Sequence, residues 1–256
     1  MLSTGVHHLG RATTQFMAFN GYPVDKDDPQ YRANCEAMFR FVKAETDQGR
    51  PVVIWGAYVP EFAAAVGTGD DCYYVSSFKE VIKEDQPPVG IYDLDLVHIN
   101  YALAFPTAGF ACREHAGEFA VHRALRLMTQ PTEHAKYGWG LGGYDLWAAA
   151  LRADKADAFG NGYNSKCWHE ARHYAAIFIR RMAEKLTERS EHLAKAADHL
   201  DRVSAATGEV SKLFPFPPPD KTLSEEVRLA AAEHLMDARA AEEQAIAELK
   251  LACGVE

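Results

Sequence analysis

The segment His169-Glu170-Ala171-Arg172-His173 has the residue types and the spacing of a metal site. Two histidines at positions i and i+4 of a helix lie on one face, where His169 and His173 could hold a divalent metal such as Zn or Fe. Glu170 between them could then act as the catalytic general base on a metal-bound water. The pattern therefore predicts a metal-dependent hydrolase. The alternative interpretation is a helix that carries two neighbouring histidines and no metal.

Two observations weigh against this metal hypothesis. Metalloprotease helices usually carry uncharged residues between the ligand pair, because the helix is buried, whereas Arg172 is charged. No third ligand follows in the Gly-turn-His arrangement. Glu170 and His173 also match the ExxH of di-iron bundles, but the only comparable pair, Glu118 with His122, has the wrong spacing. We therefore expect either no cofactor or one divalent metal at this helix.

A second candidate site is the glycine-rich segment from Gly138 to Gly143. It has neither the spacing of a dinucleotide-binding motif nor the Lys-Ser/Thr pair of a phosphate-binding loop. Its glycines allow the chain to pass close to the aromatic side chains of Trp139 and Tyr144. We expect these two residues to contact a small-molecule substrate.

The composition excludes several classes of protein. The 256 residues carry a formal charge of -9, which disfavours binding to nucleic acid and to anionic membranes. Mean hydropathy is -0.26, and no apolar run approaches the roughly 20 residues of a transmembrane helix. The first ten residues lack the pattern of a secretory signal. Five cysteines without a CxxC pair are typical of reduced thiols, so we expect a cytoplasmic protein.

The first 108 residues, which we expect to form one domain, mix β-branched and aromatic runs with Pro, Gly and Asp. Apolar spacing and turn signals predict two helices followed by four short strands. The helices are expected over 10–19 and 31–46, and the strands over 51–55, 62–66, 72–77 and 97–103. This order indicates an α+β fold with a small antiparallel sheet.

Residues 109–256 are rich in Ala, Leu, Glu and Arg and are predicted to form an α-helical domain. Helices are expected over 114–129, 141–153, 165–186 and 190–207, and from the N-cap Ser224 to about Cys253. The proline-rich segment 214–219 cannot be helical and forms a stiff connector. The alanine content suits close helix packing. A third hypothesis follows, in which this domain makes the protein a non-catalytic homo-oligomer or scaffold.

Several motifs, taken in their order along the chain, resemble a papain-like cysteine-peptidase family, the N-terminal domain of the butirosin biosynthesis protein H type. The motifs are Gly5-Val-His-His8, Gly49-Arg-Pro-Val-Val-Ile-Trp-Gly56, Val59-Pro-Glu-Phe62 and the turn Gly67-Thr-Gly-Asp-Asp71. The later segments 142–147, 170–178 and 227–239 resemble the helical region found with these domains. The resemblance implies a papain-like first domain followed by an α-helical one.

The resemblance places the catalytic pair of that family where this chain has other residues. The nucleophilic Cys of the family corresponds to His8, and its catalytic His corresponds to Glu61. Because such a pair works through a thiolate beside an imidazole, the resemblance implies that the ancestral chemistry is lost. Cys35, in an apolar helix, is expected to be a buried core thiol.

What the resemblance then implies is a divergent hydrolase or acyltransferase fold. It would bind a small molecule or an acyl substrate in a cleft between the two parts. That cleft would lie near His8, Glu61, Trp139, Tyr144 and His169.

Overall fold

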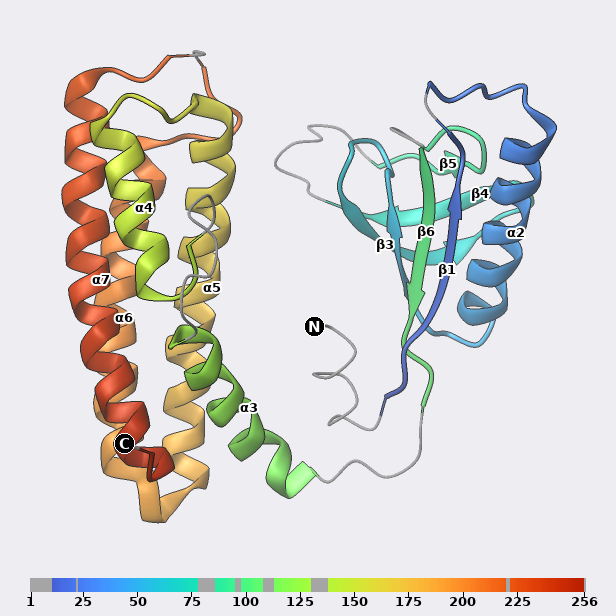
Figure 1. Cartoon of the computed structure of the whole chain (residues 1–256). Coiled ribbons are helices and arrows are strands. Elements are labelled where there is room, and N and C mark those ends of the chain that lie inside the picture. Colours follow the sequence, from blue (N-terminus) through green and yellow to red (C-terminus); the bar gives the residue numbers. More distant parts are fainter. Residues whose placement is uncertain are drawn as a thin grey trace. The chain divides into compact units, whose positions relative to one another are not determined.

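A computed structural model of the chain describes residues 11–21, 23–77, 86–94, 98–107, 113–129, 138–219 and 222–255 (Figure 1). The chain divides into two compact units, Met1–Ala116 and Gly117–Glu256. The boundary predicted after residue 108 lies shortly before this division. In the parts of the chain that the structure describes, no helix is long and apolar enough to span a bilayer.

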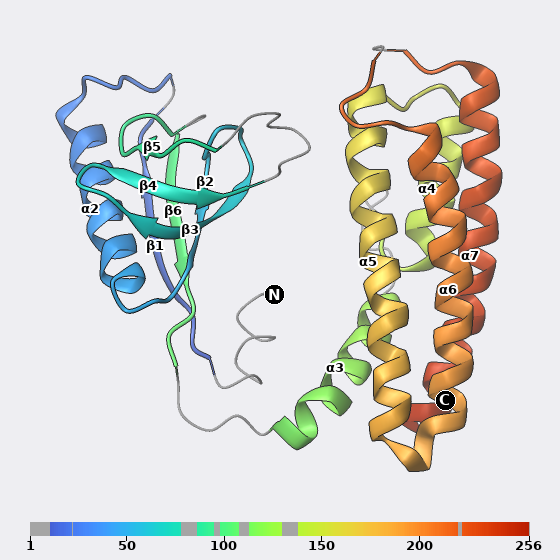
Figure 2. The same ribbon diagram turned by 180° about the vertical axis from the view of Figure 1, so that it is seen from behind.

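The first unit contains an antiparallel sheet of six strands with helix α2 (Pro29–Thr46) on one face (Figure 2). The strands lie in the order β1-β6-β2-β3-β4-β5. Their bounds are β1 Thr14–Phe19, β2 Val52–Trp55, β3 Phe62–Thr68, β4 Cys72–Ser76, β5 Val89–Gly90 and β6 Ile99–Ala104. The mixed α and β content and the antiparallel sheet predicted from the sequence are confirmed.

The helix predicted over residues 10–19 is wrong, because β1 occupies Thr14–Phe19 and pairs with β6. Phe16 packs towards α2, with its ring centroid 6.4 Å from that of Phe41, whereas Met17 and Phe19 are exposed. Alternation of this kind is the period of a strand. The apolar residues on both faces hid this alternation in the sequence.

Helix α2 provides the apolar face that covers the sheet. Asp28 caps it by accepting a hydrogen bond from the Gln30 amide, and a proline occupies its first turn. Its buried residues recur at helical spacing: Tyr31, Cys35, Met38 and Val42. They form one core with alternate residues of the central strands, such as Val52, Ile54 and Ala102. Cys35 is 0% exposed, as expected for a core thiol.

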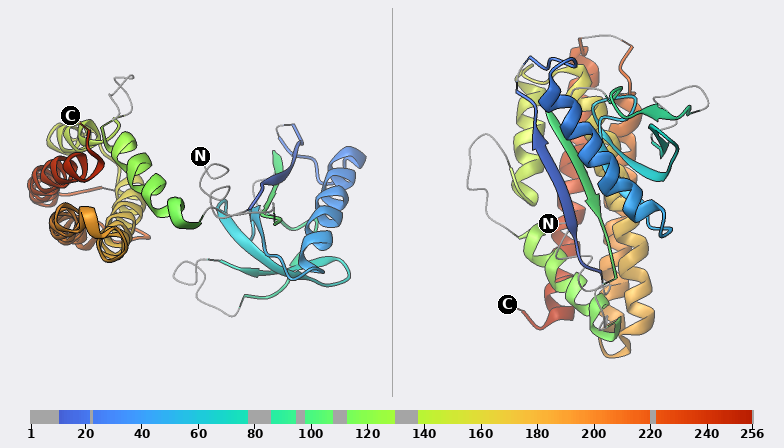
Figure 3. Two further views of the ribbon diagram at one scale, coloured as in Figure 1. Left: turned by 90° about the horizontal axis from the view of Figure 1, so that it is seen from below. Right: turned by 90° about the vertical axis from the view of Figure 1, so that its right-hand side faces the viewer.

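The second unit is a helical bundle, seen end-on in the left view of Figure 3. Its helices are α3 (Arg113–Met128), whose first turn precedes the division, α4 (Leu141–Arg152), α5 (Ala158–Lys185), α6 (Ser190–Leu213) and α7 (Glu225–Cys253). Helix α6 packs against both α5 and α7, and α4 packs against α7. Four buried alanines recur every seven residues along α7: Ala231, Ala238, Ala245 and Ala252. Small side chains at this spacing keep one face of α7 close to its neighbours.

Most helix ends of this unit follow local sequence signals. Ser224 caps α7 through the Val227 amide, and Gly254 ends the helix in the left-handed conformation, as the sequence predicts for its bounds. Helix α5 begins earlier than the predicted residue 165, because Asp157 caps it by accepting from the Gly160 amide. Gly162 is needed there, since a Cβ would lie 2.8 Å from the Pro215 carbonyl oxygen.

Candidate functional site

The residues of the predicted metal site lie in the middle of α5. His169 is half-buried, and its Nδ1 lies 3.1 Å from the Ser204 carbonyl oxygen. His173 and Glu170 are exposed, and the ring centroids of the two histidines are 6.4 Å apart. Among the described residues, no group of three or more His, Cys, Asp or Glu side chains is arranged to hold a metal ion. The metal site therefore stays a prediction, without a third ligand from the described part of the chain.

Arg172 of the same motif forms an ion pair with Glu242 of α7. Its Nε donates to Glu242 Oε2 at 2.7 Å and its Nη2 donates to Oε1 at 2.8 Å. The Glu242 side chain is 0% exposed, and the Tyr144 hydroxyl of α4 donates to its Oε2 at 2.5 Å. A buried carboxylate needs such partners, because a buried charge without them is strongly unfavourable. Arg172, the charged residue that departs from the metalloprotease pattern, therefore belongs to a network that connects α4, α5 and α7.

Burial and charge shift the pKa values of Tyr144 and Arg172 within this Tyr144–Glu242–Arg172 network. Burial raises the pKa of the Tyr144 phenol above its ordinary value, and the negative charge of Glu242 raises it further. Burial lowers the pKa of Arg172, but the attraction and hydrogen bonds of its partners, above all Glu242, together outweigh burial, so the pKa of Arg172 lies above its ordinary value. At neutral pH Arg172 is therefore a cation and Tyr144 a neutral phenol.

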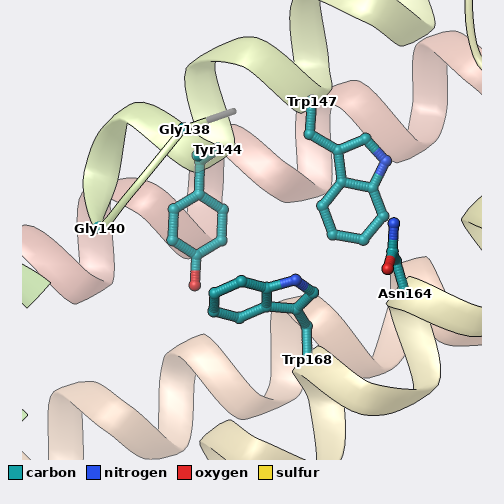
Figure 4. Close-up of a pocket in the computed structure, with 7 residues that line it drawn as sticks. Gly138, Gly140, Tyr144, Trp147, Asn164 and Trp168 are labelled. Atoms are coloured by element: carbon teal, nitrogen blue, oxygen red, sulfur yellow. The ribbon is translucent and has the colours of Figure 1, made fainter. Parts of the chain in front are cut away.

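A pocket of about 310 Å³ lies beside the network, within the second unit (Figure 4). The residues that line it come from the segment just before α4, from α4 itself and from α5: Gly138, Gly140, Gly143, Tyr144, Trp147, Asn164 and Trp168. Its volume falls in the lower part of the roughly 300–1,000 Å³ typical of small-molecule sites. Three aromatic residues, three glycines and one asparagine therefore form its wall.

The aromatic walls of the pocket are held by neighbouring polar groups. Trp147 Nε1 donates to Asn161 Oδ1 at 2.6 Å, which orients the indole. The Trp168 ring lies with its centroid 6.3 Å from that of Tyr144, and the Arg172 guanidinium carbon lies 4.3 Å from the Trp168 centroid. This last contact is a cation–π interaction. The same arginine thus holds both the buried carboxylate and one wall of the pocket.

The glycines at the start of α4 are required by close backbone contacts. A Cβ on Gly138 would lie 2.6 Å from the Cα of Gly143. Gly140 has a φ of +52°, and a Cβ there would lie 2.0 Å from the Met128 carbonyl oxygen. Only glycine fits these positions without a shift of the backbone. The glycine-rich segment therefore shapes one side of the pocket with its main chain.

The structure places the predicted site residues in different parts of the chain. Tyr144 lines the pocket, and Trp139 lies between two of the lining glycines with 40% of its surface exposed. Glu61 belongs to the first unit, in the turn before β3, where its carbonyl oxygen accepts from the Gly56 amide. His8 lies outside the described residues.

Sequence reasoning missed several residues of this site, namely Trp147, Asn164, Trp168 and Glu242. One signal could have found Glu242, since it is a single acidic residue on the apolar, alanine-rich face of α7. Trp168 precedes Arg172 by four residues, a spacing that brings two side chains together on a helix.

Cys35 has a different environment from a catalytic thiol. It is fully buried, and the Asn100 side-chain amide lies 3.5 Å from its Sγ. A reactive thiol instead needs a positive group that stabilises the thiolate.

Comparison with known proteins adds no family to this description. No family profile matches the chain, and no curated protein matches its sequence. The resemblance to papain-like domains therefore stays a prediction that rests on the order of its motifs.

Proposed function

We propose that this protein binds a neutral small molecule with a flat apolar part in the pocket between the start of α4 and α5. The observation that supports this proposal is an aromatic pocket whose lining residues carry no charge and whose neighbours Arg172 and Glu242 are paired with each other. Trp147, Trp168 and Tyr144 offer π surfaces on which a flat ring can stack. The Asn164 amide and the main chain at the glycines offer hydrogen bonds that orient a polar substituent.

The pairing of Arg172 argues for a neutral ligand over an anion. Both its Nε and its Nη2 already donate to the Glu242 carboxylate. An anion that recruited this guanidinium would leave the buried carboxylate without its counter-charge, which is strongly unfavourable. A cationic ligand could make cation–π contacts with the aromatic side chains, but it would be repelled by Arg172, whose guanidinium carbon lies 4.3 Å from the Trp168 ring centroid.

We also propose that the first unit is a divergent papain-like domain. The antiparallel sheet with α2 packed on one face supports this proposal, as does the β2–β3 hairpin that carries Glu61. In this proposal the ancestral Cys–His chemistry is lost, and the ligand of the helical pocket is a small molecule or an acyl substrate. The alternative, a metal-dependent hydrolase at His169, His173 and Glu170, requires a stoichiometric bound metal.

A matched series of naphthalene derivatives tests the choice of ligand. The probes are 2-naphthol, which is neutral, 2-naphthoate, an anion, and 2-(aminomethyl)naphthalene, a cation. Isothermal titration is expected to show the tightest binding for 2-naphthol. Trp168→Ala should weaken that binding about tenfold, the equivalent of one stacking contact. Tyr174→Ala changes an exposed aromatic residue of the same helix and should have no effect. Failure of all three probes to bind, or equal binding to Trp168→Ala, would contradict the proposal.

A further inference from the structure

Strand β1 forms an outer edge of the sheet. It stands first in the strand order, and among the residues that the structure describes no strand pairs with its far side. Its sequence, Thr-Gln-Phe-Met-Ala-Phe, contains no charge, proline or glycine. Natural edge strands are usually protected by charges, prolines, bulges or shortness, and the opposite edge strand β5 has only 2 residues. The β1 edge lacks these protections.

The register with β6 shows which backbone groups of β1 face away from β6. The Ala12 amide donates to the Pro106 carbonyl, and the Asn20 amide donates to the His98 carbonyl. Hydrogen-bonded and non-hydrogen-bonded pairs alternate along an antiparallel ladder, so the even-numbered residues bond to β6. The backbone N–H and C=O groups of Gln15, Met17 and Phe19 therefore point away from β6, towards the open edge.

We propose that two copies of this chain associate through their β1 edges in an antiparallel pair centred on Met17. A two-fold axis at Met17 places Gln15 opposite Phe19 of the second copy, and Met17 opposite its own equivalent. By the same symmetry, Phe19 lies opposite Gln15 of the second copy. In this register the three outward residues of each copy are the ones that face each other, and each pair exchanges two hydrogen bonds. The edge is thus self-complementary, as a two-fold interface requires.

The side chains of the same residues support this partner. Met17 is 50% exposed and Phe19 is 70% exposed, both on the sheet face opposite α2. Met17 lies opposite Tyr101 of β6, whose ring centroid is 6.0 Å from that of Phe62. The ring centroid of Phe62 in turn lies 4.8 Å from that of Trp55. Pairing at Met17 would join this apolar row to the same row of the second copy.

Charge and area define the strength of the association. The chain carries a formal charge of -9, which opposes self-association in general. The β1 strand contains no charged residue, so pairing two β1 strands brings no like charges of the strands together. One strand pair buries less than the roughly 800 Å² per partner of a standard interface. We therefore expect a reversible dimer with a Kd on the order of 10 μM.

Sedimentation velocity of the full chain tests this association. Between about 1 and about 200 μM, a range around the expected Kd, the wild type should shift from monomer to dimer. Met17→Pro removes an outward N–H but no bond to β6, so the strand should keep its place in the sheet. We expect this variant to be monomeric over the whole range with an unchanged circular dichroism spectrum. Met17→Leu, which keeps the N–H, should dimerise as the wild type does.

Disulfide trapping tests the register. Facing residues of a hydrogen-bonded pair have Cα atoms about 5.5 Å apart, within disulfide range. Met17→Cys should therefore form a dimer linked at that position, located by mass spectrometry of the linked peptide. Gln15→Cys lies four residues from its equivalent, roughly 13 Å away, and should not link.

Three outcomes would overturn the proposal. They are a wild type that stays monomeric at the highest concentration, a Met17→Pro variant that dimerises as the wild type does, and linkage through Gln15→Cys in place of Met17→Cys. Dimers that persist in Met17→Pro would place the interface elsewhere, for example in the helical unit.

Discussion

The hydroxyl of Tyr144 donates a 2.5 Å hydrogen bond to the carboxylate of Glu242, a residue 98 positions later in the chain. Arg172 completes the contact from a third helix, so one buried carboxylate connects α4, α5 and α7. The pocket lies against this connection. Changes to the network should therefore affect both the stability of the second unit and the binding of a ligand.

Glu242→Gln should lower the free energy of unfolding by about 3–5 kcal/mol, because it leaves the Arg172 guanidinium buried without its counter-charge. Urea unfolding followed by circular dichroism measures this change. Glu243→Gln is the matched control, because the Glu243 side chain is exposed and its Oε2 lies 3.5 Å from Arg239 Nη1. The control should change stability by less than about 0.5 kcal/mol. Equal effects of the two variants would mean that the network does not stabilise the fold.

Tyr144→Phe should lower stability by about 1.5–3 kcal/mol at neutral pH, because it removes a hydrogen bond to a charged group. Burial raises the pKa of the Tyr144 phenol above the ordinary value of 10.0. A raised pKa in the folded state gives stability that is fully present below pH 10 and is lost as the pH rises above it. The difference between wild type and Tyr144→Phe should therefore shrink at high pH.

Urea unfolding of both proteins from about pH 8 to about pH 11 checks this pH dependence. Comparison with the variant removes the contributions of other groups, including Tyr31 and Tyr73, whose pKa values are also raised by burial. A difference that is constant across this range would show that the Tyr144 phenol titrates alike in the folded and unfolded states.

Metal analysis separates the proposed binding function from the metal-dependent hydrolase. We expect purified protein to contain no stoichiometric Zn or Fe, because no third His, Cys, Asp or Glu side chain joins His169 and His173 in the described part of the chain. Added Zn²⁺ should leave the melting temperature unchanged. A bound metal at 100 times its Kd would instead stabilise the fold by about 2.7 kcal/mol. Stoichiometric metal that disappears in both His169→Ala and His173→Ala would favour the hydrolase.

Gly140→Ala should unfold or strongly destabilise the second unit, because its Cβ would lie 2.0 Å from the Met128 carbonyl oxygen. Gly143→Ala is the matched control, since the nearest atom to its Cβ, the Gly138 carbonyl oxygen, is 3.4 Å away. Thermal melts of both variants measure the stability of the second unit. A Gly140→Ala protein as stable as Gly143→Ala would contradict the close approach of the backbone.

Local signals explain how much of the fold the sequence predicts. The last helix follows from the cap Ser224 and from an apolar period that continues to Cys253. Strands β2, β3 and β4 follow from short apolar runs between turns. Strand β1 could not be recognised, because apolar residues on both of its faces match a helix as well as a strand.

The candidate site depends on contacts that no local pattern encodes. Arg172 and Glu242 are 70 positions apart and meet only because α5 and α7 belong to one bundle. The sequence could mark Tyr144 through the glycines before it, but it could not show that Trp168 lies opposite. The histidines, which gave the strongest motif, lie outside this network.

The seven-residue spacing of alanines along α7 has a consequence for the length of the buried ion pair. Interhelical distance depends on the size of the side chains at the contact. Ala238 and Ala245 flank Glu242 in the sequence, and both are 0% exposed. A larger residue at either position would move α7 outward, beyond the reach of the Arg172 fork. Methyl groups that carry no chemistry thus determine whether two opposite charges can touch.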